Sequence, residues 1–377
     1  MDAVFSFWIA GIGISIVLIY LWFWIKITRF YYSEIIELTT LPPNTLTIII
    51  PFRNEEQHLK KLVQHFENTI EIEPCQILFV NDHSTDNSIL ILQECLSNSS
   101  LNAKIIHLSN DQFSKKNAIH AGIMEANTPL IYTTDADCKP SVHSLSTLYS
   151  KLISTQSKLV LGPVNFIYKP SYFFGSYQLL ENISLVALGF FQLKKGKPTM
   201  GNGANMMFYK QIYLDLNPFQ FNQHIAGGDD IFFIEKCYAQ NANWVQFANT
   251  KQAEVTTHLC QTYSELYNQR IRWAKKSPLQ QTKKTQFSQI VLVLFFLVFG
   301  GCLTTLLFVE AYVLCLFIFF FKLLGDSYFL HKIAKKSGHV LPFIQIFKAS
   351  LFQPVFILWI AISQFWVPVN WKNRMYP

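Results

Sequence analysis

The chain has 377 residues, of which 50% are hydrophobic and 15% are charged, and its formal net charge is +7. This composition excludes an ordinary soluble protein, while the length allows one large soluble domain together with membrane segments. Much of the positive charge flanks apolar segments, which indicates attraction to anionic lipid and argues against nucleic acid as a partner.

The first apolar run covers residues 4–25, and a helix of this length matches the thickness of a bilayer. No small-residue cleavage site follows it, so we expect an uncleaved anchor over residues 1–27. Lys26 and Arg29 come directly after the run. The positive-inside rule then predicts an integral protein of the cell membrane whose next domain, residues 28–284, is cytoplasmic.

Strand and helix signals alternate in the first half of this domain. The expected strands are 46–50, 76–80, 104–108 and 130–134, and the expected helices are 55–69, 86–96 and 115–126. Such alternation predicts an α/β fold with a mainly parallel, Rossmann-like sheet covered on both faces. Ligands of such sheets bind beyond the carboxyl ends of the strands.

Polar clusters follow three of the four expected strands, at residues 51–55, 81–86 and 135–137. Any one of them has the composition of an ordinary turn or helix cap, and that interpretation is as good as a functional one. Three clusters at one edge of one sheet favour a ligand site.

The third cluster contains Asp135 and Asp137, whose side chains share one side of the chain because they are two residues apart. Paired carboxylates of this kind hold a divalent cation, Mg²⁺ or Mn²⁺, that neutralises a diphosphate. The alternative is a capped turn before Pro140.

Residues 172–193 are apolar, but Glu181, Asn182 and Ser184 would be costly in lipid, so a buried or interfacial helix is expected there. Farther on, Asp229 and Asp230 follow two glycines and precede a helix that reaches about Ala239. Either acid is a candidate general base. Taken alone, the pair is better explained as a helix cap.

The segment Gln269–Trp273 lies just before the second membrane region. Arg272 has the planar fork that binds a diphosphate, and Trp273 has a ring that stacks on a sugar or lies in the membrane interface. A basic, aromatic juxtamembrane helix is the competing interpretation.

Three more apolar runs, at 287–308, 311–330 and 343–367, predict a C-terminal membrane region over residues 285–377 with about three helices. Lys322 and Asp326 are four residues apart and are expected to pair on one helix face. Lys348 and Pro354 interrupt the third run, where an interfacial or re-entrant helix is the alternative to a plain span.

In order, these motifs resemble those of the family 2 glycosyltransferases, which have the GT-A fold. The matching segments are Ile50–Glu55 for I-P-x-R-N-E, Asn81–Asp86 for D-D-x-S-x-D, Asp135–Asp137 for D-A-D, Gly201–Asn205 for G-x-G-x-N, Asp229-Asp230 for E-D and Gln269–Trp273 for Q-x-x-R-W. The resemblance covers about residues 45–277. The flanking spans are similar to those of chitooligosaccharide, hyaluronan and ceramide glucosyl transferases.

The resemblance implies a role for each matched residue. The residues implied for the nucleotide are Pro51, Arg53, Glu55, Asp82, Lys115 and Asp135, those for the metal are Asp137 and Asp135, the base is Asp230 beside Asp229, and those that close over diphosphate and acceptor are Gln269, Arg272 and Trp273. The chain departs from the family pattern at Asn81, where an acid is usual, at Asp229, where Glu is commoner, and at Lys275-Lys276, where glycine is frequent.

The expected activity is therefore inverting, metal-dependent transfer of a sugar from a nucleotide-sugar, preferably a UDP-sugar, to a lipid or glycan acceptor at the membrane. A processive polysaccharide synthase is one alternative, although about four spans make a small channel. A non-catalytic membrane partner that binds sugar nucleotides is another, and the acids Asp137 and Asp230 argue against it.

Overall fold

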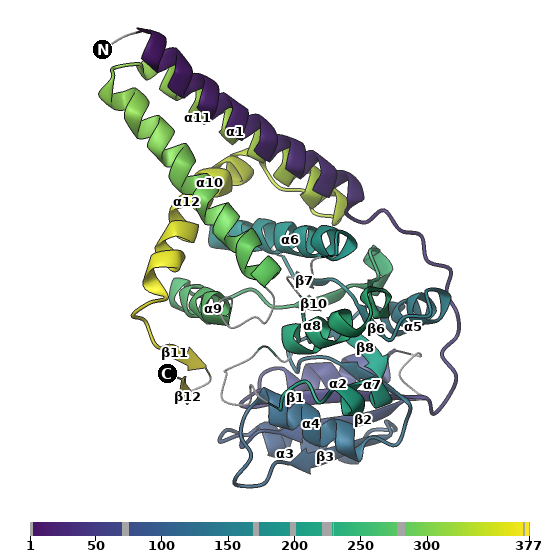
Figure 1. Ribbon diagram of the computed structural model, residues 1–377. Coiled ribbons are helices and arrows are strands. Elements are labelled where there is room, and N and C mark those ends of the chain that lie inside the picture. The colour runs from purple at the N-terminus through teal and green to yellow at the C-terminus, as the bar shows by residue number, and fades with distance from the viewer. Residues whose placement is uncertain are drawn as a thin grey trace. The chain divides into compact units, whose positions relative to one another are not determined.

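The computed structural model describes residues 3–69, 75–168, 173–196, 201–220, 228, 230–276, 283–371 and 374–376. The chain divides into two compact units (Figure 1). The first, which we call the helical unit, contains Met1–Tyr32, Tyr168–Phe191 and Leu259–Val369. The second, which we call the sheet unit, contains Ser33–Ile167, Gln192–His258 and Asn370–Pro377.

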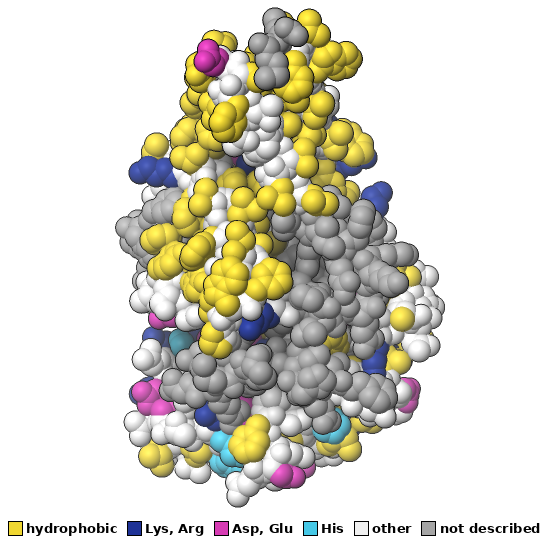
Figure 2. All heavy atoms as spheres, turned by 60° about the vertical axis from the view of Figure 1, so that its left-hand side comes forward, with side chains coloured by type: hydrophobic (Ala, Val, Ile, Leu, Met, Phe, Trp, Pro, Cys, Tyr) yellow, Lys and Arg dark blue, Asp and Glu magenta, His cyan; other side chains and the backbone are white. Residues whose placement is uncertain are grey.

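The helical unit is built from long helices. They are α1 (Ala3–Phe30), α6 (Phe173–Lys194, which belongs to this unit through Phe191), α9 (Tyr263–Lys276), α10 (Lys283–Phe308), α11 (Tyr312–Lys336) and α12 (Phe343–Ser363). Among the described residues, three segments are long and apolar enough to cross a membrane: Val4–Phe30, Tyr312–Lys336 and Phe343–Ser363. The described apolar part of α10 is shorter, Leu294–Phe308. Exposed side chains on these helices are mainly hydrophobic, as expected for contact with lipid (Figure 2).

Helices α1, α10 and α11 share a small apolar core that includes Ala10, Val17, Leu306 and Ile318. The predicted pair of Lys322 and Asp326 is confirmed as an ion pair within α11, and both side chains are 3% exposed. Helix α12 runs without interruption through Pro354 and is one of the three candidate spans.

The predicted helix at 172–193 is confirmed as α6. Its side chains Tyr177, Leu180 and Ile183 are buried, and it is not one of the segments that can cross a membrane among the described residues. Glu181 of this helix forms an ion pair with Arg270 of α9. Glu181 is therefore paired within the protein and does not face lipid, as expected from the high free energy of an unpaired acid in lipid.

The sheet unit contains a seven-stranded sheet in the order β3-β2-β1-β4-β8-β6-β9. Its strands are β1 (Leu46–Phe52), β2 (Gln76–Asn81), β3 (Ala103–His107), β4 (Leu130–Thr133), β6 (Leu159–Leu161), β8 (Met206–Tyr209) and β9 (Val245–Phe247). The first four are parallel, with Ile50 opposite Phe79 and Ile48 opposite Tyr132, whereas β8 runs antiparallel to both of its neighbours. The sheet is mixed and mainly parallel, as predicted.

A second sheet of three short strands has the order β5-β10-β7. They are β5 (Lys139–Pro140), β7 (Val164–Phe166) and β10 (Val255–Thr257). Strands β11 (Val369–Trp371) and β12 (Arg374–Tyr376) form a separate two-stranded sheet. The helices of the sheet unit are α2 (Leu59–Glu67), α3 (Ser88–Ser97), α4 (Lys115–Glu125), α5 (Ser144–Ser154), α7 (Lys210–Leu216) and α8 (Ile231–Gln240), with short 3-10 turns at Ala242–Trp244 and Lys251–Ala253.

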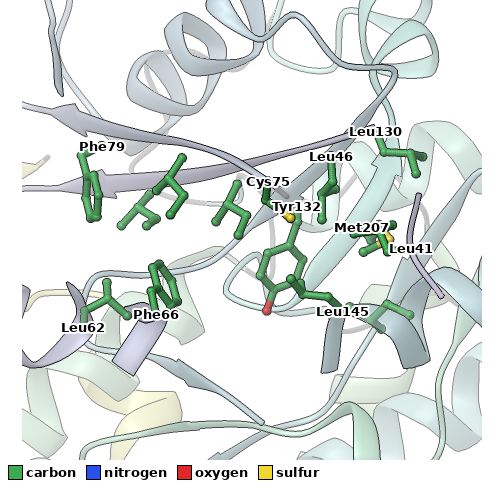
Figure 3. Close-up of a cluster of buried hydrophobic side chains, with 14 of the residues drawn as sticks. Leu41, Leu46, Leu62, Phe66, Cys75, Phe79, Leu130, Tyr132, Leu145 and Met207 are labelled. Carbon is green, nitrogen blue, oxygen red and sulfur yellow. The ribbon is translucent and has the colours of Figure 1, made fainter. Parts of the chain in front are cut away.

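Alternate residues of the central strands enter different cores, one on each face of the large sheet. Ile48 and Ile50 of β1 pack with α2, α3 and α5, the core in which Phe66, Tyr132 and Leu145 lie (Figure 3). Ile49, between them, packs with α4, α7 and α8 on the other face. Burial on both faces explains why β1 is continuously apolar.

The predicted strands and helices of residues 46–134 are confirmed, with small shifts at their ends. The largest shift is at α2, which begins at Leu59 and not at residue 55. Asn54 has a positive φ of 52°, and the carbonyl of Glu55 accepts hydrogen bonds from the backbone N–H groups of His58 and Leu59. The chain therefore makes a turn before the helix, and this turn carries candidate site residues.

Candidate active site

The loops that follow β1 and β2 are joined by hydrogen bonds at the carboxyl edge of the large sheet. The guanidinium of Arg53 donates from Nη1 to the backbone carbonyls of Asp82, at 2.8 Å, and His83, at 2.6 Å. The backbone N–H of Glu55 donates to Oγ of Ser88 at 2.7 Å. Arg53 is buried and holds the second loop in place.

Asn81 ends β2 and Asp82 directly follows it, and both residues are buried. The amide oxygen of Asn81 accepts a hydrogen bond from the backbone N–H of Ser84 at 3.0 Å, so a neutral side chain closes this turn. Oδ1 of Asp82 lies 3.3 Å from Nδ1 of His83. Pro51 is buried within β1 beside Val80. It is one of the residues that the motif resemblance implies for the nucleotide.

The loop after β4 brings two carboxylates to the same edge. Asp135 forms an ion pair with Lys115, the first residue of α4, at 2.6 Å, and the two side chains are 32% and 22% exposed. Oδ2 of Asp137 accepts a hydrogen bond from the Thr257 hydroxyl at 3.1 Å, and Oδ1 lies 3.5 Å from Sγ of Cys138. Thr257 ends β10, so the small sheet supports this carboxylate.

Asp135, Asp137 and Cys138 each offer a ligand atom, and these atoms all lie within 4.8 Å of one another. Burial raises the pKa of the Cys138 thiol well above its usual range, and the carboxylates of Asp137 and Asp135 raise it further. Without a bound cation this shift favours the protonated thiol, and a sulfur ligand suits softer metals than Mg²⁺ or Mn²⁺. Two carboxylates fit Mg²⁺ or Mn²⁺, which take oxygen ligands and complete their shell with water and substrate phosphate.

Two histidines lie in the same part of the sheet unit. Nδ1 of His58 is 2.8 Å from Oε2 of Glu55, and the ring of His58 stacks on that of His258 with centroids 5.3 Å apart. Burial lowers the pKa of His258, the charge of His58 lowers it further, and Asp137 opposes the shift. His258 directly follows Thr257, whose hydroxyl donates to Asp137.

The segment Gly201–Asn205 lies against the same strands. Asn205 is fully buried, and its Nδ2 donates to the carbonyls of Pro163 and Ala253 at 2.9 and 2.8 Å. The Thr133 hydroxyl donates to the carbonyl of Gly203 at 2.6 Å. The Thr133 bond attaches the loop before β8 to the end of β4, which precedes the two carboxylates in the chain.

Residues 47–215, the part of the chain that supplies most of this geometry, match the family model described as glycosyl transferase family 2. We call residues 47–215, which match this model, the family 2 domain. The chain is 32% identical over 96 residues to an undecaprenyl-phosphate 4-deoxy-4-formamido-L-arabinose transferase of Proteus mirabilis, a match that covers 25% of this chain and 29% of the relative. It is 27% identical over 119 residues to a dodecaprenyl-phosphate galacturonate synthase of Rhizobium johnstonii, covering 31% of this chain and 35% of the relative.

The chain thus spans about a third of the length of these curated relatives. A solved mannosyltransferase of Pyrobaculum calidifontis, in complex with GDP-Man and Mn²⁺, superposes with a TM-score of 0.55 at 14% identity. The superposition covers 96% of this chain and 98% of the mannosyltransferase. This likeness shows that the fold is GT-A.

Within the family 2 domain, the structure brings together most of the residues implied for the nucleotide and the metal. Arg53, Glu55 and Asp82 lie on the joined loops after β1 and β2, and Lys115 and Asp135 form one pair. Asp230 is the N-cap of α8, where its Oδ1 accepts a hydrogen bond from the backbone N–H of Ile231 at 2.7 Å. Asp229 lies outside the described residues.

Gln269, Arg272 and Trp273 lie on α9 in the helical unit. Arg270, between them in the chain, is buried and donates from Nε and Nη2 to the Glu181 carboxylate, at 2.9 and 2.6 Å. Its guanidinium also contacts the amide oxygen of Gln269 and lies 4.3 Å from the centroid of the Trp273 ring. Arg270 thus contacts both Gln269 and Trp273, two of the matched residues of this motif.

Sequence reasoning missed His58, Thr257, His258 and Arg270. The strand that carries Thr257 has only three residues, which is too short for a periodic signal. Arg270 is adjacent to a matched motif, but its partner Glu181 is 89 residues away. The available signal was Glu181 itself, because an acid in an apolar helix needs a partner.

Proposed function

We propose that this protein transfers a sugar from a nucleotide-sugar donor, preferably a UDP-sugar, to a prenyl-phosphate lipid, with inversion at the anomeric carbon. The observation that carries the proposal is the convergence of Lys115, Asp135 and Asp137 on the loops at the carboxyl edge of a family 2 domain. The names of both relatives specify prenyl-phosphate acceptors, which supports this class of lipid.

The donor's diphosphate is the group that the two carboxylates and the lysine suit best. Asp137 and Asp135 would hold a divalent cation, Mg²⁺ or Mn²⁺, which when bound neutralises charge on the phosphate oxygens. Lys115 adds a fixed positive charge next to Asp135. The buried loops with Pro51, Arg53, Glu55 and Asp82 would bind the base and the ribose; these roles rest on the motif resemblance.

In the transfer step, an acceptor oxygen attacks the anomeric carbon from the face opposite the diphosphate. The bond from that carbon to the diphosphate oxygen breaks, and the nucleoside diphosphate leaves with the electron pair. A lipid phosphate is mostly ionised near neutral pH and brings no proton that must be removed. If the acceptor is instead a hydroxyl of a lipid-linked glycan, Asp230 is the base that we propose for its proton.

We further propose that Gln269, Arg272 and Trp273 contact diphosphate and acceptor, on the strength of the motif alone. The apolar helices α1, α11 and α12 would hold the protein in the cell membrane. Lys26 and Arg29 after the apolar part of α1, together with Lys335 and Lys336 at the end of α11, support a cytoplasmic family 2 domain.

The proposal is tested with purified protein in lipid nanodiscs containing undecaprenyl phosphate and a panel of UDP- and GDP-sugars, with nucleotide release as the readout. We expect release for one donor, dependent on both the lipid phosphate and Mg²⁺ or Mn²⁺. Undiminished release in excess chelator contradicts the metal. Release that does not depend on the lipid phosphate contradicts the acceptor. The variant Asp215→Asn, at an exposed acid on α7, serves as a control for surface charge.

A further inference from the structure

We propose that the rings of His83 and Phe113 form the platform on which the nucleobase of the donor stacks. This inference rests on the proposed function, because it assumes a nucleotide ligand at the edge of the large sheet. Neither residue is among those that the motif resemblance implies for the nucleotide, although His83 lies within the motif Asn81–Asp86. We call the two side chains the ring pair.

The ring pair joins two loops of the sheet unit. The ring centroids are 4.5 Å apart, and the planes are inclined by 30°. His83 directly follows Asp82 after β2, and Phe113 lies between the end of β3 and Lys115, which begins α4. Because β2 and β3 are parallel neighbours, both rings stand at the same edge of the sheet as the Lys115–Asp135 pair.

The histidine of the ring pair is held firmly. The Arg53 guanidinium donates to its backbone carbonyl at 2.6 Å, and its Nδ1 lies 3.3 Å from Oδ1 of Asp82. His83 has a positive φ of 55°, a backbone conformation that is unusual outside glycine. Its Nε2 is buried and has no hydrogen-bond partner among the described residues. Such an atom is unfavourable unless a ligand or water supplies a partner, and the edge of a nucleobase offers both donors and acceptors.

The phenylalanine of the ring pair is presented to solvent by an ordered segment. Phe113 is 48% exposed, although it is among the large hydrophobic side chains. Its carbonyl accepts a hydrogen bond from Nδ2 of Asn117 at 2.9 Å, and the next residue, Ser114, is the N-cap of α4 with a φ of 110°. An exposed ring on a fixed backbone loses little conformational freedom when a flat ligand stacks on it.

A nucleobase fits this surface better than a sugar does. The groups suited to a diphosphate are Lys115, Asp135 and Asp137, and the ring pair lies beside the second loop, which contains the buried Asp82. Bases of every kind have an aromatic face, so stacking adds affinity without choosing the base. Selection between uracil and guanine would then fall to the polar edge that contains Asp82 and Nε2 of His83.

The experiment compares binding of UDP, GDP and inorganic pyrophosphate, each with Mn²⁺, to the full-length protein in detergent by calorimetry. Stacking on one aromatic side chain is worth about 5- to 150-fold in affinity. We expect Phe113→Ala to weaken UDP or GDP binding by at least about fivefold and to leave pyrophosphate binding unchanged, while Phe113→Trp retains nucleotide affinity. The control is Leu90→Ala, an exposed side chain on α3 of the same unit.

Nucleotide affinity of Phe113→Ala within about twofold of the unaltered protein overturns the platform and leaves the proposed function intact. Equal loss of nucleotide and pyrophosphate binding also overturns it, because the ring would then act on the diphosphate site or on folding. If the unaltered protein binds pyrophosphate but neither UDP nor GDP, both the platform and the proposed function fail.

Discussion

Two lysine–aspartate ion pairs of this protein lie in different surroundings. One is Lys115–Asp135 in the family 2 domain, and the other is Lys322–Asp326 in α11. The first pair is 22% and 32% exposed and belongs to a cluster of ligand atoms at a sheet edge. In the second pair each side chain is 3% exposed, and the pair lies within an apolar helix. A partly exposed ion pair contributes little to stability, and either of its members can exchange the other for a ligand. Removal of one member of a buried ion pair is strongly destabilising. We therefore propose a role in binding for the first pair and a role in folding for the second.

The largest effect is expected at Asp137, on the binding side of this comparison. Asp137→Ala removes a proposed metal ligand, and we expect transfer activity to fall by about 1,000-fold because charge on the diphosphate is no longer neutralised. The temperature of unfolding should change little, since the side chain is partly exposed. Parallel assays of transfer and thermal unfolding, with Asp215→Asn as the matched surface control, check both statements. Normal activity in this variant would remove Asp137 from the site.

The next effect is expected at Asp326, on the folding side. Asp326→Asn leaves the Lys322 ammonium buried without its counter-charge, which typically costs about 3–5 kcal/mol. We expect a clear fall in the unfolding temperature in detergent. The double variant Lys322→Met/Asp326→Leu should recover most of it, because replacing both charges by apolar groups is often neutral. If the single variant unfolds at the normal temperature and loses transfer activity, the pair belongs to function and the comparison fails.

Asp230 sharpens the comparison because it has a structural role and a proposed chemical one. Asp230→Asn keeps a good N-cap for α8, so folding should be preserved. With a lipid phosphate acceptor we expect less than about a tenfold loss of rate, since no proton has to be removed. With a hydroxyl acceptor the loss of a general base should be about 10²–10⁴-fold. Rates measured on both acceptor types decide between the two chemistries.

An effect smaller than that at Asp137 is expected at Lys115. Lys115→Met keeps the length of the side chain and removes its charge, so the ion pair with Asp135 is lost. We expect UDP binding to weaken by about tenfold, and the remaining affinity to depend less on ionic strength, because one charged contact is missing. Lys60→Met, at an exposed position of α2, is the matched control. Equal losses in both variants would show a general charge effect and not a contact.

The sequence predicts the parts of this protein that have a local signature. The apolar runs and the alternation over residues 46–134 are periodic, and the order of six motifs places Asp135 and Asp137 at a strand end. The small sheet could not be predicted, because β5 has two residues and β7 and β10 have three each. For the same reason Thr257 and His258 were missed, since only tertiary structure brings them to Asp137.

The ion pairs show the same division between local and distant contacts. Lys322 and Asp326 are four residues apart on one helix, so their pairing follows from helix geometry. Glu181 could be recognised as an acid that needs a partner, but nothing local names Arg270. Distant contacts depend on packing that a single sequence does not encode in any short window.

The most direct measurement is the mass of the lipid after incubation of the protein in nanodiscs with undecaprenyl phosphate, the active nucleotide-sugar and Mn²⁺. The account predicts a lipid product heavier by one sugar residue, formed in proportion to nucleoside diphosphate release and absent with Asp137→Ala. Release of nucleoside diphosphate together with free sugar, while the lipid mass stays unchanged, would contradict transfer to a prenyl phosphate.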